Sequence, residues 1–230
     1  MNRLIVIEGL DGSGKSTQIK RLREYLKRNK IKYKYIHFPR TKSPIYGELI
    51  SRFLRGDLGR VEDVNPYLVS LLYAGDRNDA KDQIRDWLDK EYLVLLDRYV
   101  YSNIAFQCAK LQSREEKQRL LSWILNLEYE YNHIPKPQMS VYLHVPFQFI
   151  KDKLSKKRKG VDREYLKDSY DIHEKSIQLQ KRVEEEYLKL SKEFKDIHFI
   201  SCLNRSGDME APDVIHEKIL ELLRENAIIP

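Results

Sequence analysis

A glycine-rich octapeptide near the start of the chain constrains the fold more than any other feature of the sequence. Gly9-Leu10-Asp11-Gly12-Ser13-Gly14-Lys15-Ser16 matches the pattern G-x-x-x-x-G-K-S/T. The short apolar run Leu4–Glu8 before it is typical of a strand, and apolar residues at helical spacing follow it (Ile19, Leu22 and Leu26). Strand, loop and helix in this order predict a phosphate-binding loop rather than an ordinary glycine-rich turn.

The chemistry of such a loop depends on its backbone. Glycines let backbone amides approach phosphate oxygens, and the helix amino terminus adds a favourable partial charge for an anion. We expect Lys15 to reach the β- and γ-phosphates of a nucleoside triphosphate and the Ser16 hydroxyl to ligate Mg²⁺. The expected ATP-binding set is Gly9, Leu10, Asp11, Gly12, Ser13, Gly14, Lys15, Ser16 and Thr17. The loop by itself indicates a nucleoside triphosphate and no particular reaction.

Short β-branched runs alternate with helical segments along the rest of the chain. Four more strands are expected, at Tyr33–Phe38, Tyr92–Asp97, Val141–Val145 and Ile197–Ser201. Helices are expected from Asn65-Pro66 to about Leu88, after Val145-Pro146, after Ala211-Pro212, and around Leu179, Val183, Tyr187, Leu190 and Phe194. This alternation predicts an α/β fold with a five-stranded parallel sheet flanked by helices, in one domain over residues 1–230.

Composition bears on the compartment of the protein. A chain of 230 residues with 41% apolar residues can bury a sizeable core. Its two cysteines are too few for a disulfide framework. The first apolar run is too short for a signal peptide, and no apolar stretch is long enough to cross a bilayer. We therefore expect a cytoplasmic protein without a membrane partner.

The net charge of +7 is unevenly distributed, which bears on the kind of partner. Between Lys151 and Lys167 there are eight basic residues against three acidic ones, which accounts for most of the excess. A local cationic segment suits a small polyanion such as ATP better than a long duplex. We expect no nucleic-acid partner.

Four segments in chain order resemble the thymidylate kinase family. They are Ile7-Glu8-Gly9-Leu10-Asp11-Gly12-Ser13-Gly14-Lys15-Ser16-Thr17, then Phe38-Pro39-Arg40, then Tyr73 with Arg77, then Asp97-Arg98-Tyr99 with Ser102 and Asn103. The resemblance implies a P-loop kinase fold with a mobile lid at about residues 151–171. It further implies ATP and dTMP as substrates, Mg²⁺ as cofactor, and a homodimer. The helices near Asn65–Leu88 and Ser102–Ala109 could form its interface or could equally be core.

The resemblance also implies the residues that bind the acceptor, dTMP. Phe38, Pro39 and Arg40 would approach its phosphate, often with a cis peptide at the proline, and Arg98 would clamp that phosphate. Tyr73, where the family usually has phenylalanine, would stack on thymine, and Arg77 would hydrogen-bond the base. Ser102 and Asn103 would lie near the nucleoside, Phe106 would screen the sugar, and Asp11 would hold the 3′-hydroxyl or, through water, the metal.

Each of these roles has a plain structural alternative. Tyr73 and Arg77 lie four residues apart and could simply pack in the core, on the helix face opposite Leu68 and Leu72. Asp97, implied to orient the metal or a water, could form a structural ion pair with Arg98. Arg40 could be a solvated arginine after a strand-ending proline.

The transferred phosphoryl group needs a cation above it. No basic residue lies between Leu10 and Ser13, so the resemblance places that cation in the lid, with Arg158 first and Lys157 and Arg163 next. The alternative for this run is a solvated loop. The expected catalytic residues are therefore Lys15, Asp97, Arg98, Arg158, Lys157 and Arg163, with Ser16 and Asp97 on the metal. A phosphate acceptor is already mostly ionised at neutral pH and needs no general base.

Other functions stay open from the sequence. One alternative is a kinase for another deoxynucleotide or for a deoxynucleoside; two arginines aimed at the acceptor, Arg40 and Arg98, favour a phosphorylated substrate over a nucleoside. A second alternative is a P-loop ATPase or switch without an acceptor. Nucleic-acid binding ranks last, because the positive charge is local.

Overall fold

A parallel β-sheet forms the centre of the molecule in the computed structural model, which describes residues 3–154 and 176–230. Its strands are β1 (Leu4–Glu8), β2 (Tyr33–His37), β3 (Leu93–Asp97), β4 (Met139–His144) and β5 (Ile197–Ser201), in the order β2-β3-β1-β4-β5. All neighbouring pairs are parallel. The predicted α/β class is confirmed. The largest shift of a predicted strand is in β4, which begins at Met139 rather than Val141.

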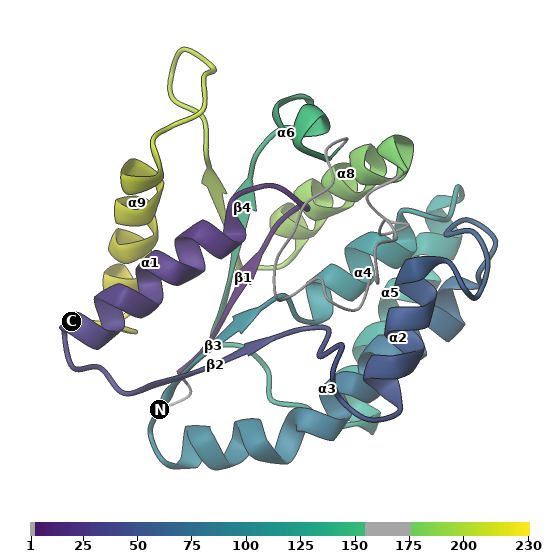
Figure 1. Ribbon diagram of the computed structural model, residues 1–230, viewed down its shortest axis with the longest axis horizontal. Helices are drawn as coiled ribbons and strands as arrows, with labels where there is room; N and C mark the ends of the chain where they lie inside the picture. Colours follow the sequence, from purple (N-terminus) through teal and green to yellow (C-terminus); the bar gives the residue numbers. More distant parts are fainter. Residues whose placement is uncertain (1–2, 155–175) are drawn as a thin grey trace.

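Helices cover both faces of this sheet (Figure 1). Helices α1 (Lys15–Arg28) and α9 (Pro212–Glu225) lie on one face and pack against each other. The other face carries α3 (Pro66–Asp89), α4 (Val100–Cys108), α5 (Arg114–Leu125) and α8 (Ile177–Glu193). Two further helices, α2 (Tyr46–Arg55) and α6 (Phe147–Leu154), contact α3 and α8 respectively. Helices α2 and α5 were not among those predicted from the sequence.

The core lies where the central strands meet these helices. Every residue of β1 and of β3 is buried, as expected for strands of a parallel sheet covered on both faces. The predicted buried face of α1 is present, with Ile19, Leu22 and Leu26 all inside. Every residue of α4 is also buried within the chain. Of the two helical regions considered for a subunit interface, the one at Ser102–Ala109 is therefore core.

Helix α3 begins as predicted but turns an unexpected side inward. The Asn65 side chain accepts a hydrogen bond from the backbone N–H of Tyr67 at 2.9 Å, and Pro66 is the first helical residue. Of the two leucines predicted opposite Tyr73 and Arg77, only Leu68 is exposed, because Leu72 is partly buried and packs against the core as Tyr73 does. Leu68 is 62% exposed whereas Arg77 is 2% exposed, so a leucine faces out and a charged side chain faces in.

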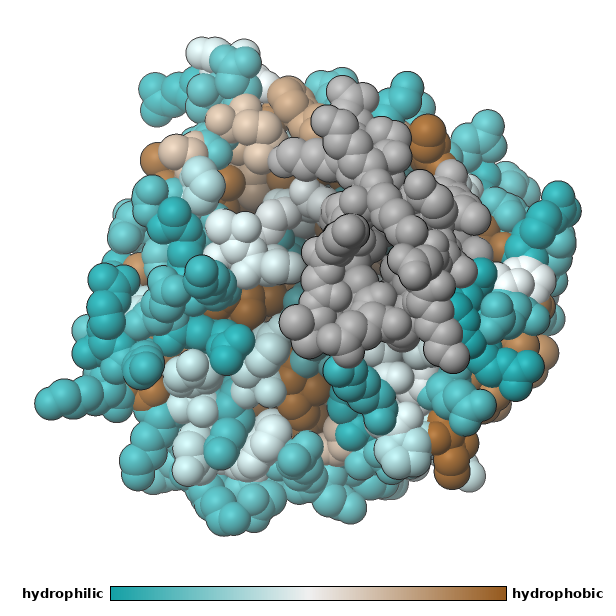
Figure 2. Space-filling model, viewed as in Figure 1, coloured by the Kyte–Doolittle hydropathy of each residue, from teal (hydrophilic) through white to brown (hydrophobic). Residues whose placement is uncertain are grey.

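The surface in Figure 2 is mostly hydrophilic, with apolar residues in small patches between polar ones. In the part of the chain that the structure describes, no helix combines the length and the apolar character needed to cross a membrane. The greater part of the expected lid, including Lys157, Arg158 and Arg163, lies outside the described residues.

Candidate active site

The sheet register brings the phosphate loop and the end of β3 together. Ile7 of β1 pairs with Asp97 of β3, and the Arg98 N–H donates to the Ile7 carbonyl at 3.0 Å. On the other side of β3, the Phe38 N–H donates to the Asp97 carbonyl at 2.9 Å. Three of the predicted segments thus meet at the carboxyl edge of the sheet, where open α/β sheets bind their ligands.

The phosphate loop has the backbone that the motif requires. Gly9, Gly12 and Gly14 have φ angles of 151°, 81° and 90°, in the region that favours glycine. At Gly9 a Cβ atom would lie 2.9 Å from the Leu143 carbonyl, so a side chain would push the loop away from β4. The loop passes directly into α1, which begins at Lys15.

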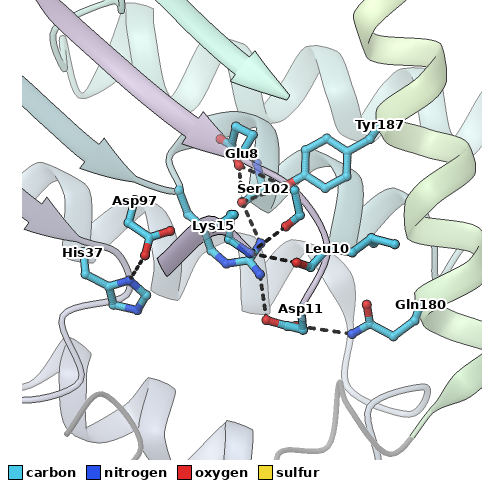
Figure 3. A network of polar contacts seen from close by, with 11 residues as sticks. Glu8, Leu10, Asp11, Lys15, His37, Asp97, Ser102, Gln180 and Tyr187 are labelled. Atoms are coloured by element: carbon cyan, nitrogen blue, oxygen red, sulfur yellow. Dashed lines mark hydrogen bonds and ion pairs between the residues drawn. The ribbon is translucent and has the colours of Figure 1, made fainter. Parts of the chain in front are cut away.

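Lys15 is buried inside the loop. Its Nζ donates to the carbonyls of Gly9 and Leu10 at 3.1 and 2.8 Å, and Figure 3 shows the amine reaching the Leu10 carbonyl. Burial, together with the nearby charge of Arg98, lowers the pKa of Lys15 to about 8, although Asp11 and other acids oppose this. Burial disfavours the charged form of this amine, so an anion that binds beside it would stabilise the charge.

Arg98 connects the phosphate loop to α4. Its Nη2 donates to Asp11 Oδ1 at 2.7 Å, its Nη1 donates to Ser102 Oγ at 3.2 Å, and its guanidinium lies 5.3 Å from the ring centroid of Phe106. Burial opposes the charge on Arg98, but Asp11 and other acids raise its pKa, so the group stays cationic. The acid within the phosphate loop therefore has a clear electrostatic partner. The alternative was an ion pair between Arg98 and Asp97, but Arg98 hydrogen-bonds Asp11 instead.

Asp11 also contacts α8, which follows the expected lid in the chain. Gln180 Nε2 donates to Asp11 Oδ2 at 3.3 Å, and the Gln180 side chain is buried (Figure 3). Sequence reasoning missed Gln180, because a single glutamine on a helix carries no pattern.

Asp97 has an unpartnered oxygen of the kind that a metal could use. Its Oδ2 lies 3.0 Å from His37 Nδ1, whereas its buried Oδ1 has no hydrogen-bond partner among the described residues. Burial would raise the pKa of Asp97, but the His37 hydrogen bond and the nearby cations Lys15 and Arg98 outweigh it and lower the pKa. An ionised carboxylate beside the phosphate loop, with exposed Ser16 in the first turn of α1, fits the oxygen ligands that Mg²⁺ prefers.

Glu8 organises a buried network that the sequence did not indicate. Its Oε2 accepts from the Ser102 hydroxyl and, at 2.9 Å, from the Tyr187 hydroxyl, while its Oε1 accepts from the Tyr99 N–H at 3.0 Å. Burial raises the pKa of Glu8 in spite of these donors. Figure 3 shows the side chains of Glu8, Ser102 and Tyr187 pointing toward one another. The one signal in the sequence was an acidic residue closing an otherwise apolar strand.

Two residues expected near the nucleoside make framework contacts. The Ser102 hydroxyl belongs to the Glu8 network, and Asn103 Nδ2 donates to the Ser70 carbonyl at 3.1 Å. Both side chains are buried. Their hydrogen bonds therefore hold α4 against β1 and α3.

Arg40 is held by α3 rather than solvated. Its backbone N–H and its Nε donate to the Asp76 carboxylate at 2.8 and 2.9 Å, and its Nη2 donates to Asp79 at 2.6 Å. The Phe38-Pro39 peptide before it is cis, as the resemblance implied. These contacts give the Phe38-Pro39-Arg40 turn a defined place beside α3.

Tyr73 and Arg77 share one face of α3. Tyr73 is half-buried and packs against the core, and the Arg77 guanidinium lies 5.9 Å from the ring centroid of Tyr99. Arg77 Nε donates to Glu128 Oε1 at 2.9 Å, and Arg77 Nη2 contacts the same oxygen. Glu128 is a partner that sequence reasoning missed, because it lies 51 residues further along the chain.

Known proteins resemble this chain over most of its length. A sequence model of the family described as thymidylate kinase matches residues 7–211. A thymidylate kinase of Plasmodium falciparum (isolate 3D7) is 34% identical over 144 residues, or 63% of this chain and 62% of that protein. A probable thymidylate kinase of Thermococcus kodakarensis is 30% identical over 224 residues, or 95% of this chain and 96% of that protein.

A solved structure agrees in fold as well as in sequence. The thymidylate kinase of Candida albicans, whose structure is described as revealing the origin of broad substrate specificity, aligns with a TM-score of 0.74 and 27% identity. The alignment covers 99% of this chain and 93% of that one. The matched residues, 7–211, run from the end of β1 to the N-cap of α9 and take in the phosphate loop, the Phe38-Pro39-Arg40 turn and the Asp97-Arg98 strand end, so the chain belongs to the thymidylate kinase family.

Proposed function

We propose that this protein transfers the γ-phosphoryl group of ATP to the 5′-phosphate of dTMP, forming dTDP for dTTP and DNA synthesis. The observation that carries the proposal is the meeting of two cations, the buried Lys15 and the largely buried Arg98, around Asp11 at the carboxyl ends of β1 and β3. Phosphoryl transfer needs alignment and neutralisation of negative charge more than covalent chemistry. One cation on each side of the transferred group supplies both.

On the donor side, the phosphate loop holds ATP. The amides of Gly12 to Ser16 and the Lys15 amine bind the β- and γ-phosphates, and Thr17 extends this set along the first turn of α1. Ser16 and Asp97 would hold Mg²⁺, which supplies charge neutralisation at the phosphates when bound. Asp97 Oδ1, which has no hydrogen-bond partner among the described residues, supports this assignment.

On the acceptor side, Arg98 binds the dTMP phosphate, with Arg40 and the Phe38-Pro39 turn beside it. Tyr73 stacks on the thymine ring, Arg77 donates to the base, and Phe106 screens the sugar. Asp11 holds the 3′-hydroxyl of the sugar while keeping Arg98 in place. Ser102 and Asn103 contribute by fixing α4 near the nucleoside. Arg158, with Lys157 and Arg163, supplies the further cation from the lid.

Two other attributes belong to the same proposal. The active form is a homodimer that uses α3, whose outward leucines Leu68 and Leu71 are 62% and 48% exposed. Exposed apolar residues on one helix favour association. The enzyme works in the cytoplasm, where ATP is available, and both of its cysteines are free and buried.

The decisive experiment measures ADP formation with ATP, Mg²⁺ and one acceptor at a time. The acceptors are dTMP, dUMP, dCMP, dGMP and thymidine. The proposal expects ADP formation that depends on dTMP, with weaker use of the other bases and none of thymidine. Preference for a purine monophosphate or for thymidine contradicts the dTMP assignment. ADP formation that ignores every acceptor supports a P-loop ATPase instead.

A further inference from the structure

One face of α3 contacts residues 128–133, a segment distant in the sequence. Residues at helical spacing contact the stretch 128–133: Lys81 Nζ donates to the Asn132 carbonyl at 3.0 Å, and the Arg85 guanidinium contacts the His133 carbonyl. Arg77, one turn earlier, contacts the same stretch through Glu128. Lys81 and Arg85 bind only backbone oxygens there. The contact between Arg77 and Glu128 is the one in this row that joins two charged side chains.

Glu128, which contacts Arg77, lies in a π-helix, a rare backbone conformation. It lies in a π-helical segment, η1 (Asn126–Tyr131), that continues α5. A π turn of this segment is closed by the Asn132 N–H, which donates to the Leu127 carbonyl at 2.9 Å, and the Ile134 N–H beyond it donates to the Glu128 carbonyl at 3.1 Å. Single π-helical turns within helices are frequently found at functional sites. Here the turn carries one fully buried acid towards the arginine.

The pair is more than a stabilising contact. Glu128 is 0% and Arg77 2% exposed, and burying two such charges costs desolvation energy that their attraction often does no more than offset. Both Arg77 donors use Glu128 Oε1, whereas Oε2 is buried with no hydrogen-bond partner in the portion that the structure describes. A buried ion pair is weak evidence for stability, and an unsatisfied buried oxygen beside it calls for a role beyond folding.

The geometry of the contact gives that role. A guanidinium is a rigid planar fork with five N–H donors. Glu128 engages one edge, formed by Nε and Nη2, and Tyr99 lies 5.9 Å from the guanidinium carbon. The donors on Nη1 and the second N–H of Nη2 are left on the other edge. Their direction is set by Glu128, because rotation of the side chain would break both of its hydrogen bonds.

From this arrangement we infer that Glu128 is a positioning residue for Arg77 and thereby determines which pyrimidine the site accepts. The inference rests on the proposed function, in which Arg77 donates to the base. An arginine offers only donors, so a held guanidinium favours a base with a carbonyl at C4, such as thymine or uracil. It disfavours cytosine, whose C4 carries an amino group that is itself a donor.

The test compares Glu128→Ala and Glu128→Gln with wild type for the KM of dTMP, the KM of ATP and the ratio of kcat/KM for dTMP over dCMP. Misplacing a group by about 1 Å, even far from the chemistry, can lower activity on the order of a hundredfold. Glu128→Ala keeps Arg77 and removes only the residue that positions it, so we expect the KM of dTMP to rise by about tenfold or more. It should also lower the dTMP over dCMP ratio and leave the KM of ATP nearly unchanged. Glu128→Gln, which keeps one acceptor oxygen, should lie between Glu128→Ala and wild type.

Two controls separate positioning from folding. Glu130 lies in the same π-helical segment but is exposed, 3.6 Å from Lys136, so Glu130→Ala should leave all three quantities as in wild type. Adding Glu128→Ala to Arg77→Ala should have no further effect on dTMP, because the residue acts through the arginine. If Glu128→Ala does not fold, the same three quantities in Glu128→Gln test the inference, because glutamine preserves the shape of the side chain.

Wild-type values of KM and base preference in Glu128→Gln and Glu128→Ala would overturn the inference. An equal rise in both KM values would do the same, because it would indicate a general loss of structure. Either result leaves dTMP-dependent activity of the wild type, and so the proposed function, intact. A wild type that forms no ADP with dTMP contradicts the proposed function itself.

Discussion

At the scale of single residues, the site is a set of charges buried close together. Lys15 and Asp97 are buried and the Arg98 side chain is 11% exposed, and each has its charge opposed by burial and adjusted by its neighbours. Removing water strengthens every interaction with an incoming phosphate. In the protein without ligand, these charges lose contact with solvent, and this desolvation lowers its free energy of unfolding.

That cost is measurable at Lys15. Its pKa is about 8 in the folded protein against 10.5 for the ordinary group, so the folded state binds fewer protons between these values. Stability therefore rises with pH across this window, and the penalty of the buried cation is fully present below pH 8. Relative to Lys15→Met, the wild type should gain roughly 3 kcal/mol in free energy of unfolding between pH 7 and pH 10.5.

Denaturant unfolding of both proteins at several pH values checks this. The exposed Lys20 on the same helix provides the control, and Lys20→Met should follow the wild type at every pH. A constant difference between wild type and Lys15→Met across the pH range would mean that the amine is not buried as described.

At the scale of elements, α3 does more than any other helix to assemble the acceptor side. Its residues Asp76 and Asp79 hold Arg40, Arg77 meets Glu128, and Lys81 and Arg85 hold the segment after α5. The helix begins at a defined cap. Its start thus sets the position of every side chain along it.

The cap gives a prediction at this scale. Asn65 accepts a hydrogen bond from the Tyr67 N–H at the start of α3. Asn65→Ala should lower the free energy of unfolding by about 1 kcal/mol and the Tm by about 2–4 °C. Asn65→Asp keeps an acceptor at the cap and should stay near the wild type. Calorimetry measures both variants, and an unchanged Tm in Asn65→Ala would show that the cap contributes nothing.

At the scale of the whole molecule, the outward face of α3 is the candidate for subunit contact. Leu68 and Leu71 lie on it, whereas α4, the other region considered, is entirely buried. A charge in place of Leu71 would be expensive to bury between subunits but costs little on an exposed monomer surface.

Leu71→Glu should therefore convert a dimer into a monomer with a similar Tm. Sedimentation velocity of the wild type and the variant at several concentrations measures this. Val214→Glu on α9, where the valine is 47% exposed, is the matched control and should sediment like the wild type. A wild type that is monomeric at all concentrations, or a variant that remains dimeric, contradicts an interface on α3.

The local features of this protein follow from neighbouring residues in the sequence. Strand periods, the Asn65-Pro66 cap and the glycine spacing from Gly9 to Gly14 depend on neighbouring residues, and all are present in the structure. The sequence also predicts that the ends of β1 and β3 lie close together, because the carboxyl ends of parallel strands lie at one edge of the sheet. The π-helical segment did not follow from the sequence. Helices α2 and α5 were not predicted either, although their buried apolar residues lie at helical spacing, at Ile50, Phe53 and Leu54 in α2 and at Leu120, Leu121 and Ile124 in α5.

The partners of the charged residues depend on how distant elements pack together. Nothing in the sequence near Arg77 indicates Glu128, nor does anything near Asp97 indicate His37, which lies 60 residues away. A buried charge is tolerated only where another charge or a hydrogen-bonding group reaches it, and packing of distant elements sets which one does. For the same reason the inward turn of Arg77 and the outward turn of Leu68 could not be read from the apolar pattern of α3.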